Sequence, residues 1–404
     1  MNITDVKSDP SFTFDATAYD TIVVGAGFAG AVAARELAER KGSRVAVIER
    51  RPHIAGNTYD HLDKQGVLIH EYGPHIYHTV HERVHNYLSR FTEWRDYRHE
   101  VLAFIRGEYI PVPFNLNSIE MTYDAEKAAK LNDLLVSTFG IGTKVPIIDL
   151  RKQDEPLLKE LAEYVYENVF LYYTQKQWDL TPEQIDPAVT ARVPVLVDRD
   201  NRYFTDTFQG MPQDGYLSLF ENLLDFPGID VFVNLDARSL MSFEQSGDGE
   251  SYQAILINGR RFEGTVIYTG ALDDLTGEAF GLLPYRSIDF EYDYYDTKRV
   301  QPCGTVNFTV SEDYTRTTEY TWLTGQDIEV TTVAREYSSA FTDPATQTPY
   351  YPIFSGENQA YYDRYRDLFK DLPNFHPLGR LAEYRYYNMD QIVLRALELI
   401  DELV

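Results

Sequence analysis

The stretch YDTIVVGAGFAGAVAARELAERKGSRVAVIERR, residues 19–51, decides the fold of this chain. It opens with a β-branched run at residues 21–24, which is typical of a buried parallel strand. An alanine-rich helical pattern follows to residue 40, and Gly42 marks its end. A second strand is predicted over residues 44–48. The segment therefore predicts a strand–helix–strand unit with two parallel strands.

The turn between the first strand and the helix carries the pattern GxGxxG at residues 25–30. Glycines at these positions tighten the turn and let the backbone approach a pyrophosphate at the helix N-terminus. Glu49 ends the second strand 19 positions after Gly30, close to the spacing of about 20 residues typical of a ribose-binding acid. Because strand, helix, second strand and acid agree, the segment predicts a site for an ADP-containing cofactor.

Two further elements favour FAD over NAD. Ala55-Gly56-Asn57 follows soon after the acid and resembles the second glycine element of FAD proteins of the glutathione-reductase and amine-oxidase type. Near the other end of the chain, GRLAEYRYYNMD at residues 379–390 places a glycine before a terminal amphipathic helix. In such flavoproteins the N-terminus of this helix faces the isoalloxazine ring, where its dipole favours the negative charge of reduced flavin.

Composition narrows the classes of partner. The 404 residues suggest two or three domains, and a net charge of −26 argues against nucleic acid or anionic membranes as partners. An anionic small ligand would need a local basic pocket. The single cysteine, Cys303, excludes an intrachain disulfide and a cysteine-based zinc site, and a cytoplasmic protein is expected. Residues 1–18 are expected to be a loose extension, and membrane insertion is not expected.

The order of elements predicts an α/β fold in three parts. A discontinuous Rossmann-like FAD-binding domain is expected over residues 19–85, 206–285 and 355–404. A helical insert domain with a mobile lid is expected over residues 115–195. An antiparallel β-sheet substrate domain is expected over residues 86–114, 196–205 and 286–354, with TEYTWL at 318–323 as one of its strands.

Histidines gather early in the chain, at His70, His75, His78, His81 and His85. A zinc site is conceivable, since His81 and His85 could share one face of a helix. No acidic ligand pattern accompanies them, and the Tyr-Gly-Pro turn at residues 72–74 indicates a loop. No metal site is therefore predicted.

Residues 171–195, LYYTQKQWDLTPEQIDPAVTARVPV, place aromatic and amide side chains ahead of an arginine. A uracil favours an aromatic face with amide partners, and a diphosphate favours arginine, whose fork matches phosphate oxygens. Taken alone, Tyr173 and Trp178 fit a protein core, and Arg192 fits a solvated surface. The polar Gln-Lys-Gln between the two aromatic residues favours a pocket wall, with Lys176 itself expected to face solvent.

The whole chain resembles the bacterial UDP-galactopyranose mutases. The motifs that carry the resemblance are VVGAGFAGAVAAREL (23–37), YGPHIYHT (72–79), PVPFNL (111–116), YTQKQW (173–178), ARVPV (191–195), FQGMPQDGY (208–216), YTR (314–316), YYPI (350–353) and GRLAEYRYYNMD (379–390). They recur in family order along nearly the whole chain, which is far more specific than the glycine pattern alone.

The resemblance implies a non-redox reaction at a redox cofactor, the interconversion of UDP-galactopyranose and UDP-galactofuranose with FAD in its reduced state. In this family N5 of the flavin attacks the anomeric carbon of the sugar and UDP leaves. The covalent adduct lets the sugar ring open, a different hydroxyl closes it, and UDP returns. No side chain need act as a strong acid or base, and paired arginines stabilise the departing UDP. By analogy, a homodimer is expected.

The resemblance also assigns site residues. The expected cofactor contacts are Gly25, Gly27, Phe28, Ala29, Gly30, Glu49, Arg50, Gly56, Asn57, His75, Gly379, Arg380, Asn388 and Met389. The expected substrate contacts are Phe170, Tyr173, Thr174, Trp178, Arg192, Tyr203, Arg316, Tyr351, Tyr386 and Asn388. Arg192, Arg316 and His75 are expected to serve catalysis, and residues 181–195 to close over the substrate. Without the resemblance, Arg316 fits best as a salt-bridge partner in so acidic a chain.

Three positions depart from the family pattern. Ala55 and Tyr172 stand where members often have glycine, and Asn388 stands where some have aspartate, which weakens any role that needs a carboxylate there. Two other classes stay open. An oxidase of the amine-oxidase type would have an apolar site with an aromatic cage, and a binding protein like the GDP-dissociation inhibitors would lack the cofactor. The two arginines argue against the first, and the intact glycines and Glu49 argue against the second.

Overall fold

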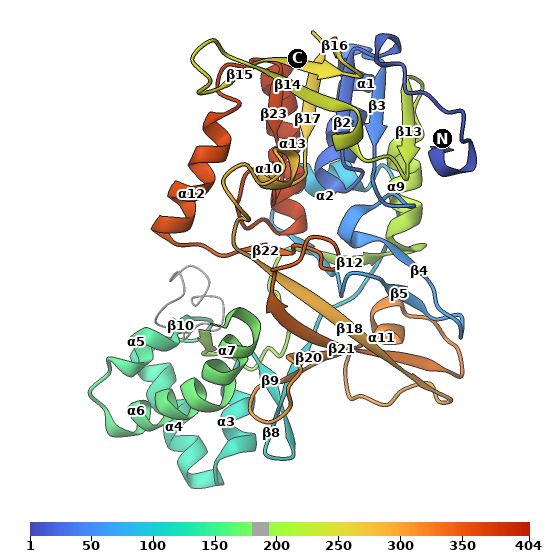
Figure 1. Cartoon of the computed structure of the whole chain (residues 1–404). Coiled ribbons are helices and arrows are strands. Elements are labelled where there is room, and N and C mark those ends of the chain that lie inside the picture. The colour runs from blue at the N-terminus through green and yellow to red at the C-terminus, as the bar shows by residue number, and fades with distance from the viewer. Residues whose placement is uncertain (180–193) are drawn as a thin grey trace.

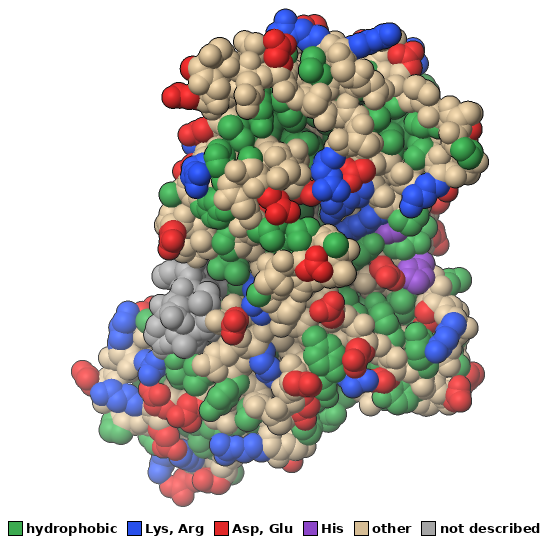
Figure 2. Space-filling model, viewed as in Figure 1, with side chains coloured by type: hydrophobic (Ala, Val, Ile, Leu, Met, Phe, Trp, Pro, Cys, Tyr) green, Lys and Arg blue, Asp and Glu red, His purple; other side chains and the backbone are tan. Residues whose placement is uncertain are grey.

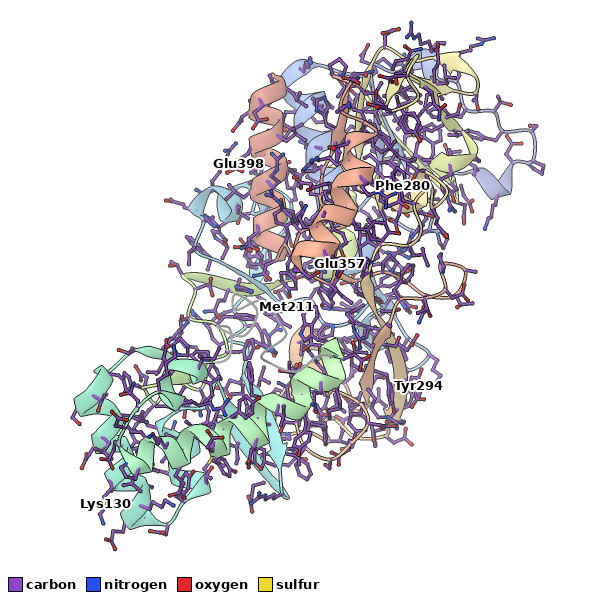
Figure 3. All side chains as sticks on the ribbon, turned by 60° about the vertical axis from the view of Figure 1, so that its left-hand side comes forward. Lys130, Met211, Phe280, Tyr294, Glu357 and Glu398 are labelled. Carbon is purple, nitrogen blue, oxygen red and sulfur yellow. The ribbon has the colours of Figure 1, made fainter. Side chains whose placement is uncertain are left out.

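The computed structural model describes residues 1–179 and 194–404. Figure 1 shows an upper part built on one sheet and a lower part in which a second sheet lies beside a group of helices. Figure 3 marks these regions with Glu398 on the terminal helix above, Met211 between the parts, and Lys130 at the tip of the helical group. The predicted α/β fold class, with a Rossmann-like domain, a helical insert and a second sheet, is confirmed.

The upper sheet has six strands in the order β1-β13-β3-β2-β17-β23, and every neighbouring pair is parallel. Its strands are β1 (Asn2–Asp5), β2 (Thr21–Val24), β3 (Val45–Ile48), β13 (Ile229–Val233), β17 (Thr265–Tyr268) and β23 (Phe375–Pro377). Val23 and Val47 pack into one core, and Ile22 and Ile48 into another on the opposite face. Burial on both faces explains why the central strands β2 and β3 are almost wholly apolar.

Helices and a small sheet cover the two faces of this sheet. One face carries α1 (Phe28–Lys41), α2 (Glu82–Leu88), α9 (Gly215–Leu224) and α13 (Met389–Leu403). The other carries α10 (Leu272–Leu275), α12 (Gly356–Asp367) and the sheet of β14 (Met241–Gln245), β15 (Tyr252–Ile257) and β16 (Arg260–Arg261). Helix α1 ends at Gly42, whose φ of 69° is left-handed, as the sequence predicts.

The N-terminal residues differ from the expected loose extension. Strand β1 pairs in parallel with β13, from Asn2 opposite Asp230 to Asp5 opposite Val233. Phe14 is buried, and its ring meets that of Phe232 edge to face at 5.4 Å. The expectation is therefore wrong for this segment, because its order comes from a free sheet edge more than two hundred residues away and not from a local pattern.

The lower sheet has seven strands in the order β22-β18-β21-β20-β19-β8-β9. Its strands are β8 (Val101–Ile105), β9 (Glu108–Val112), β18 (Tyr285–Tyr295), β19 (Thr305–Phe308), β20 (Arg316–Glu319), β21 (Thr331–Ala340) and β22 (Tyr351–Pro352). All pairs are antiparallel except β8 with β19. The hairpin of β8 and β9 turns at Arg106 and Gly107, both with positive φ.

The predicted strand TEYTWL is only partly correct. Strand β20 stops at Glu319, and the next residues form helix α11 (Tyr320–Thr324), which ends at Gly325 with a left-handed φ of 72°. The fully buried Glu319 carboxylate accepts hydrogen bonds from the backbone N–H groups of Val300 at 3.0 Å and Gln301 at 2.8 Å. This contact with a distant loop fixes where the strand stops, and the strand-like side chains of the segment gave no sign of it.

The helical group lies beside the lower sheet. Its elements are α3 (Leu116–Thr122), α4 (Ala125–Phe139), α5 (Ile147–Arg151), α6 (Pro156–Val165), a π-helix (Tyr166–Leu171) and α7 (Tyr172–Trp178), with the strand pair β10 (Lys144–Pro146) and β11 (Pro194–Leu196). All of these elements except α7 share one hydrophobic core with β8 and β9. The π-helix widens the chain just before α7, at a place where such segments often mark function.

Short strands join the upper and lower parts. They are β4 (Asp60–Leu62) paired with β5 (Leu68–His70), and the sheet of β6 (Tyr77–Thr79), β12 (Phe208–Pro212) and β7 (Trp94–Arg95). Figure 1 shows β12 crossing this middle region. The chain passes between the upper and lower parts in this region, so side chains from both sheets lie around the same space.

Candidate functional site

Two cavities meet in the middle region. The first, of about 290 Å³, follows the carboxyl ends of β2 and β3, where ligands bind in open α/β sheets. The second, of about 520 Å³, lies between α7, the lower sheet and the short middle strands. Six residues line both: Asn57, His75, Tyr350, Arg380, Asn388 and Met389. The two cavities are therefore neighbours that share a wall.

Most of the expected cofactor contacts line the first cavity. They are Gly25, Gly27, Phe28, Ala29, Glu49, Arg50, Gly56, Asn57, His75, Gly379, Arg380, Asn388 and Met389. Gly30 does not line it. A Cβ there would lie 1.9 Å from the carbonyl oxygen of Gly25, so this glycine lets α1 pack closely on the turn. Its part is in packing, which is one of the three roles that glycines play in this motif.

Glu49 holds the glycine turn against β3. Its Oε2 accepts from the backbone N–H of Ala26 and its Oε1 from that of Arg51, both at 2.9 Å. The side chain is buried and faces the first cavity. Each carboxylate oxygen has a second lone pair, so Glu49 can also accept hydrogen bonds from a ligand's hydroxyl groups.

The second glycine element closes on the first. A Cβ on Gly56 would lie 2.8 Å from the Cα of Gly27, so the two turns touch backbone to backbone. The backbone N–H of Ala55 donates to the carbonyl of Ala26 at 3.0 Å. Ala55 has a left-handed φ of 74°, the conformation that the glycine common in the family would adopt without strain. Ala55 therefore adopts the same turn, but its left-handed backbone is strained where a glycine would not be.

Arg380 lies where the cavities meet. Its guanidinium donates to the carbonyls of Tyr387 at 2.6 Å and Tyr350 at 3.3 Å. It also lies 4.9 Å from the ring centre of Tyr351 and 5.3 Å from that of Tyr386, rings that stack 5.5 Å apart. This arrangement keeps a positive charge at the shared wall in a strongly acidic chain.

His75 is neutral, and its tautomer is set by the backbone. Its Nδ1 lies 2.8 Å from the carbonyl oxygen of Gly73, which can only accept, so Nδ1 carries the proton and Nε2 has a free lone pair. The backbone N–H of His75 donates to Nδ1 of His70 at 3.0 Å. Burial, helped by the charge of Arg380, lowers the pKa of His75 to about 4. His75 therefore offers an acceptor and no charge to both cavities.

The second cavity brings together residues far apart in the sequence. The expected substrate contacts that line it are Phe170, Tyr173, Thr174, Trp178, Tyr203, Arg316, Tyr351, Tyr386 and Asn388. Arg192, and all but the last two residues of the expected lid at 181–195, lie outside the described residues. Trp178 and Tyr351 approach within 6.1 Å between ring centres, so aromatic faces from α7 and β22 form one side of the cavity.

Arg316 combines two roles that the sequence left as alternatives. Its Nη2 donates to the hydroxyl of Tyr173 at 2.7 Å, and its Nε lies 3.4 Å from a carboxylate oxygen of Glu336. Burial opposes its charge, but Glu336, with smaller contributions from nearby tyrosines, raises the pKa of Arg316 above its usual range. Arg316 is thus a salt-bridge partner and also a permanent cation at the second cavity.

Several lining residues were not expected from the sequence. They are His99, Thr305, Asn307, Glu336 and Tyr350. Asn307 Oδ1 and Thr305 Oγ1 are buried without a hydrogen-bond partner among the described residues, and they lie two positions apart on β19. Alternation along the strand places both on one face, but only the sheet order shows that this face lines a cavity.

Lys176 does not face solvent, so that expectation is wrong. Its Nζ donates to the carbonyls of Phe308, Glu312 and Tyr314.

Within the described residues no group of three or more His, Cys, Asp or Glu side chains could hold a metal. His85 instead stacks on Phe208, with ring centres 4.1 Å apart. No helix in the described part of the chain is long and apolar enough to span a membrane.

The parallel sheet and the first cavity define a Rossmann-like dinucleotide-binding protein. A family model described as an NAD(P)-binding Rossmann-like domain matches residues 23–91. A second, described as UDP-galactopyranose mutase, matches residues 168–386. The chain belongs to the UDP-galactopyranose mutase family, and it is an enzyme of the isomerase class.

Relatives cover nearly the whole chain. The UDP-galactopyranose mutase of Mycoplasma pneumoniae is 33% identical over 393 residues, which cover 96% of each chain. The dTDP-fucopyranose mutase of Escherichia coli is 33% identical over 380 residues, which cover 93% of this chain and 96% of the relative. A crystal structure of reduced UDP-galactopyranose mutase superposes with a TM-score of 0.68 over 95% of this chain and 93% of the other, at 16% identity, and so shows the same fold.

Proposed function

We propose that this chain is a flavin-dependent UDP-galactopyranose mutase that interconverts UDP-galactopyranose and UDP-galactofuranose. The observation that carries the proposal is the partly buried Arg316–Tyr173 pair in a cavity that shares a wall with the glycine-lined cavity. A nucleotide sugar in the second cavity would have its reacting end at that wall, next to a cofactor in the first. The family relationship supports the same assignment.

The residues of the first cavity fit FAD. The contact between Gly27 and Gly56 leaves no room for a Cβ at Gly56, and it forms the close turn that a pyrophosphate needs. Glu49 would accept from the ribose hydroxyls, and Asn57, His75 and Met389 at the shared wall would surround the flavin ring. When bound and reduced, FAD would supply a nucleophilic nitrogen, N5, for the anomeric carbon of the sugar.

The side chains of the second cavity would bind and orient the substrate. Arg316, with Tyr173 as an oriented hydroxyl, would hold the diphosphate, and Arg192 is proposed to join it. Phe170 and Trp178 would contact the uridine. Burial keeps the pKa of Tyr173 well above its usual range, so its phenol stays neutral and can donate a hydrogen bond to a phosphate.

The charge pattern suits this substrate. Figure 2 shows acidic and basic side chains scattered over a surface that is otherwise mostly uncharged, and the chain as a whole carries a net charge of −26. Arg316 and Arg380 line the second cavity, so an anion gains favourable charge there despite the acidic chain. A fixed cation in a poorly solvated site stabilises the negative charge that develops as UDP departs. Arg316 would provide this stabilisation without moving a proton.

Three further parts of the proposal concern organisation. We propose a flavin-binding domain over 19–85, 206–285 and 355–404, a helical domain over 115–195, and a sheet domain over the residues between them. We also propose a homodimer in the cytosol. Sedimentation equilibrium of the flavin-loaded protein tests the dimer, and cell fractionation tests the location.

The function is tested on purified protein. It should be yellow, with a flavin absorption spectrum, and should convert UDP-galactofuranose to UDP-galactopyranose only after reduction with dithionite. The dTDP-fucopyranose substrate of a relative should be tried in parallel, because that relative is as similar as the UDP-galactopyranose mutases. Flavin without isomerisation would favour the oxidase class. A colourless protein would favour the binding-protein class.

A further inference from the structure

Lys176 ties helix α7 to the loop that leads into β20. It lies one turn after Tyr173, and its ammonium donates to the carbonyls of Phe308, Glu312 at 2.9 Å and Tyr314 at 3.1 Å. An ammonium has three N–H donors, so each donor has a main-chain partner. Such fixed, charge-assisted hydrogen bonds are stronger than neutral ones and hold a loop in one shape.

The loop held in this way ends at Arg316. Residues 309–315 connect β19 to β20, and Arg316 is the first residue of β20, two positions after Tyr314. The Arg316 guanidinium returns to the same helix, where it donates to the Tyr173 hydroxyl at 2.7 Å. Tyr173 and Lys176 are three residues apart and so lie on one face of α7. The helix and the loop are therefore joined at two points, by the Lys176 contacts before Arg316 and by the Arg316 side chain itself.

Two other contacts fix the remaining sides of this arrangement. Thr309 at the start of the loop donates through its hydroxyl to the carbonyl of Asn168 in the π-helix. Arg286 donates through Nε to the carbonyl of Gln177 at 2.9 Å, near the end of α7. The end of the helix and the start of the loop are thus held independently of Lys176, so loss of Lys176 would release mainly the part of the loop around Glu312 and Tyr314.

We propose that Lys176 is a positioning residue that sets the place of the Arg316 guanidinium for the phosphate groups of the substrate. This inference rests on the proposed function. Lys176 is not among the residues that line the second cavity, so it acts through the loop and not by contact with the ligand. Without it, three carbonyls lose their donor beside the acidic residues Glu312 and Asp313, and the loop moves away from α7.

The test compares Lys176→Met with Lys159→Met, the same change at an exposed lysine of α6 whose ammonium lies 3.8 Å from the Asp154 carboxylate. Titration calorimetry on flavin-loaded protein should show UDP binding weakened roughly tenfold in K176M, as expected for loss of one charge-assisted contact. Uridine binding should stay within about twofold of the original, because no phosphate is involved. K159M should match the original protein for both ligands.

A merely structural defect would give a different pattern. Equal weakening of UDP and uridine binding in K176M, or unchanged UDP binding, would overturn the inference. In a double-mutant cycle with Arg316→Met, K176M should add nothing further, and full additivity would also overturn it. Should circular dichroism show that K176M is unfolded, the same comparison is made with Lys176→Gln, whose amide keeps two N–H donors but no charge. If the original protein binds no UDP or lacks mutase activity, it is the proposed function that fails.

Discussion

Replacing Arg316 by methionine should affect stability and ligand binding by two separable routes. Its Nε lies 3.4 Å from the Glu336 carboxylate, which gives an attraction of about 5 kcal/mol at an effective dielectric constant of about 20. The cost of burying both charges offsets much of this. Removal of one partner leaves the other uncompensated, and such losses are about 3–5 kcal/mol.

The lower end of that range applies here. The Arg316 side chain is 25% exposed, but that of Glu336 is only 6% exposed. Arg316→Met should therefore lower the free energy of unfolding by about 3 kcal/mol. The double variant Arg316→Met with Glu336→Gln should recover most of this loss, because no buried charge remains. UDP affinity should fall roughly 10- to 100-fold in both variants, since each lacks the charge-assisted contact to phosphate.

Urea denaturation followed by tryptophan fluorescence measures the first effect, and calorimetric titration with UDP measures the second. Arg199→Met is a matched control, because the ion pair of Arg199 with Glu120 lies on the surface and should contribute less than about 1 kcal/mol. Two results would refute the reasoning. One is an R316M variant as stable as R199M, and the other is a double variant that regains UDP binding together with stability.

Three further changes have defined outcomes. Gly30→Ala should yield protein with little bound flavin and reduced helical signal, because its methyl group would lie 1.9 Å from the Gly25 carbonyl oxygen; a normal flavin spectrum would contradict this. Ala55→Gly should raise the free energy of unfolding by about 0.5–1 kcal/mol, since left-handed backbone costs a non-glycine residue about 1–2 kcal/mol and added freedom in the unfolded chain returns part. The urea midpoint measures this gain, and a lower midpoint would count against it. Burial lowers the pKa of His75 to about 4 and those of His70 and His99 to about 3. As the pH falls through about 6.5, the unfolded chain therefore protonates these rings before the folded chain does, and this lowers the free energy of unfolding. Burial raises the pKa of Asp273 to about 6, so the folded chain protonates this carboxylate first and part of that loss of stability is offset. The net loss of stability between pH 6 and 4 should be roughly 3 kcal/mol per pH unit, and a constant urea midpoint over this window would disprove it.

Local sequence patterns predict much of the fold. The glycine turn at residues 25–30, the apolar strands on either side of α1 and the amphipathic α13 depend on neighbours within a few residues, so the sequence predicts them directly. The hairpin at Arg106-Gly107 is local for the same reason. Motifs in family order then pointed to residues that the structure gathers in two adjoining cavities.

Contacts between distant segments decided the rest. Strand β1 is ordered by the edge of β13, and Glu319 stops β20 through a loop that has no pattern of its own. The salt bridge of Arg316 to Glu336 and the donors of Lys176 likewise depend on partners from separate elements. A single sequence shows which side chains could ionise or donate a hydrogen bond. Burial and the nearest partner decide whether each side chain is charged and where it points. By itself the sequence therefore determined the cofactor type to expect and the family, and only the tertiary structure decided how a cation is held in place within so acidic a chain.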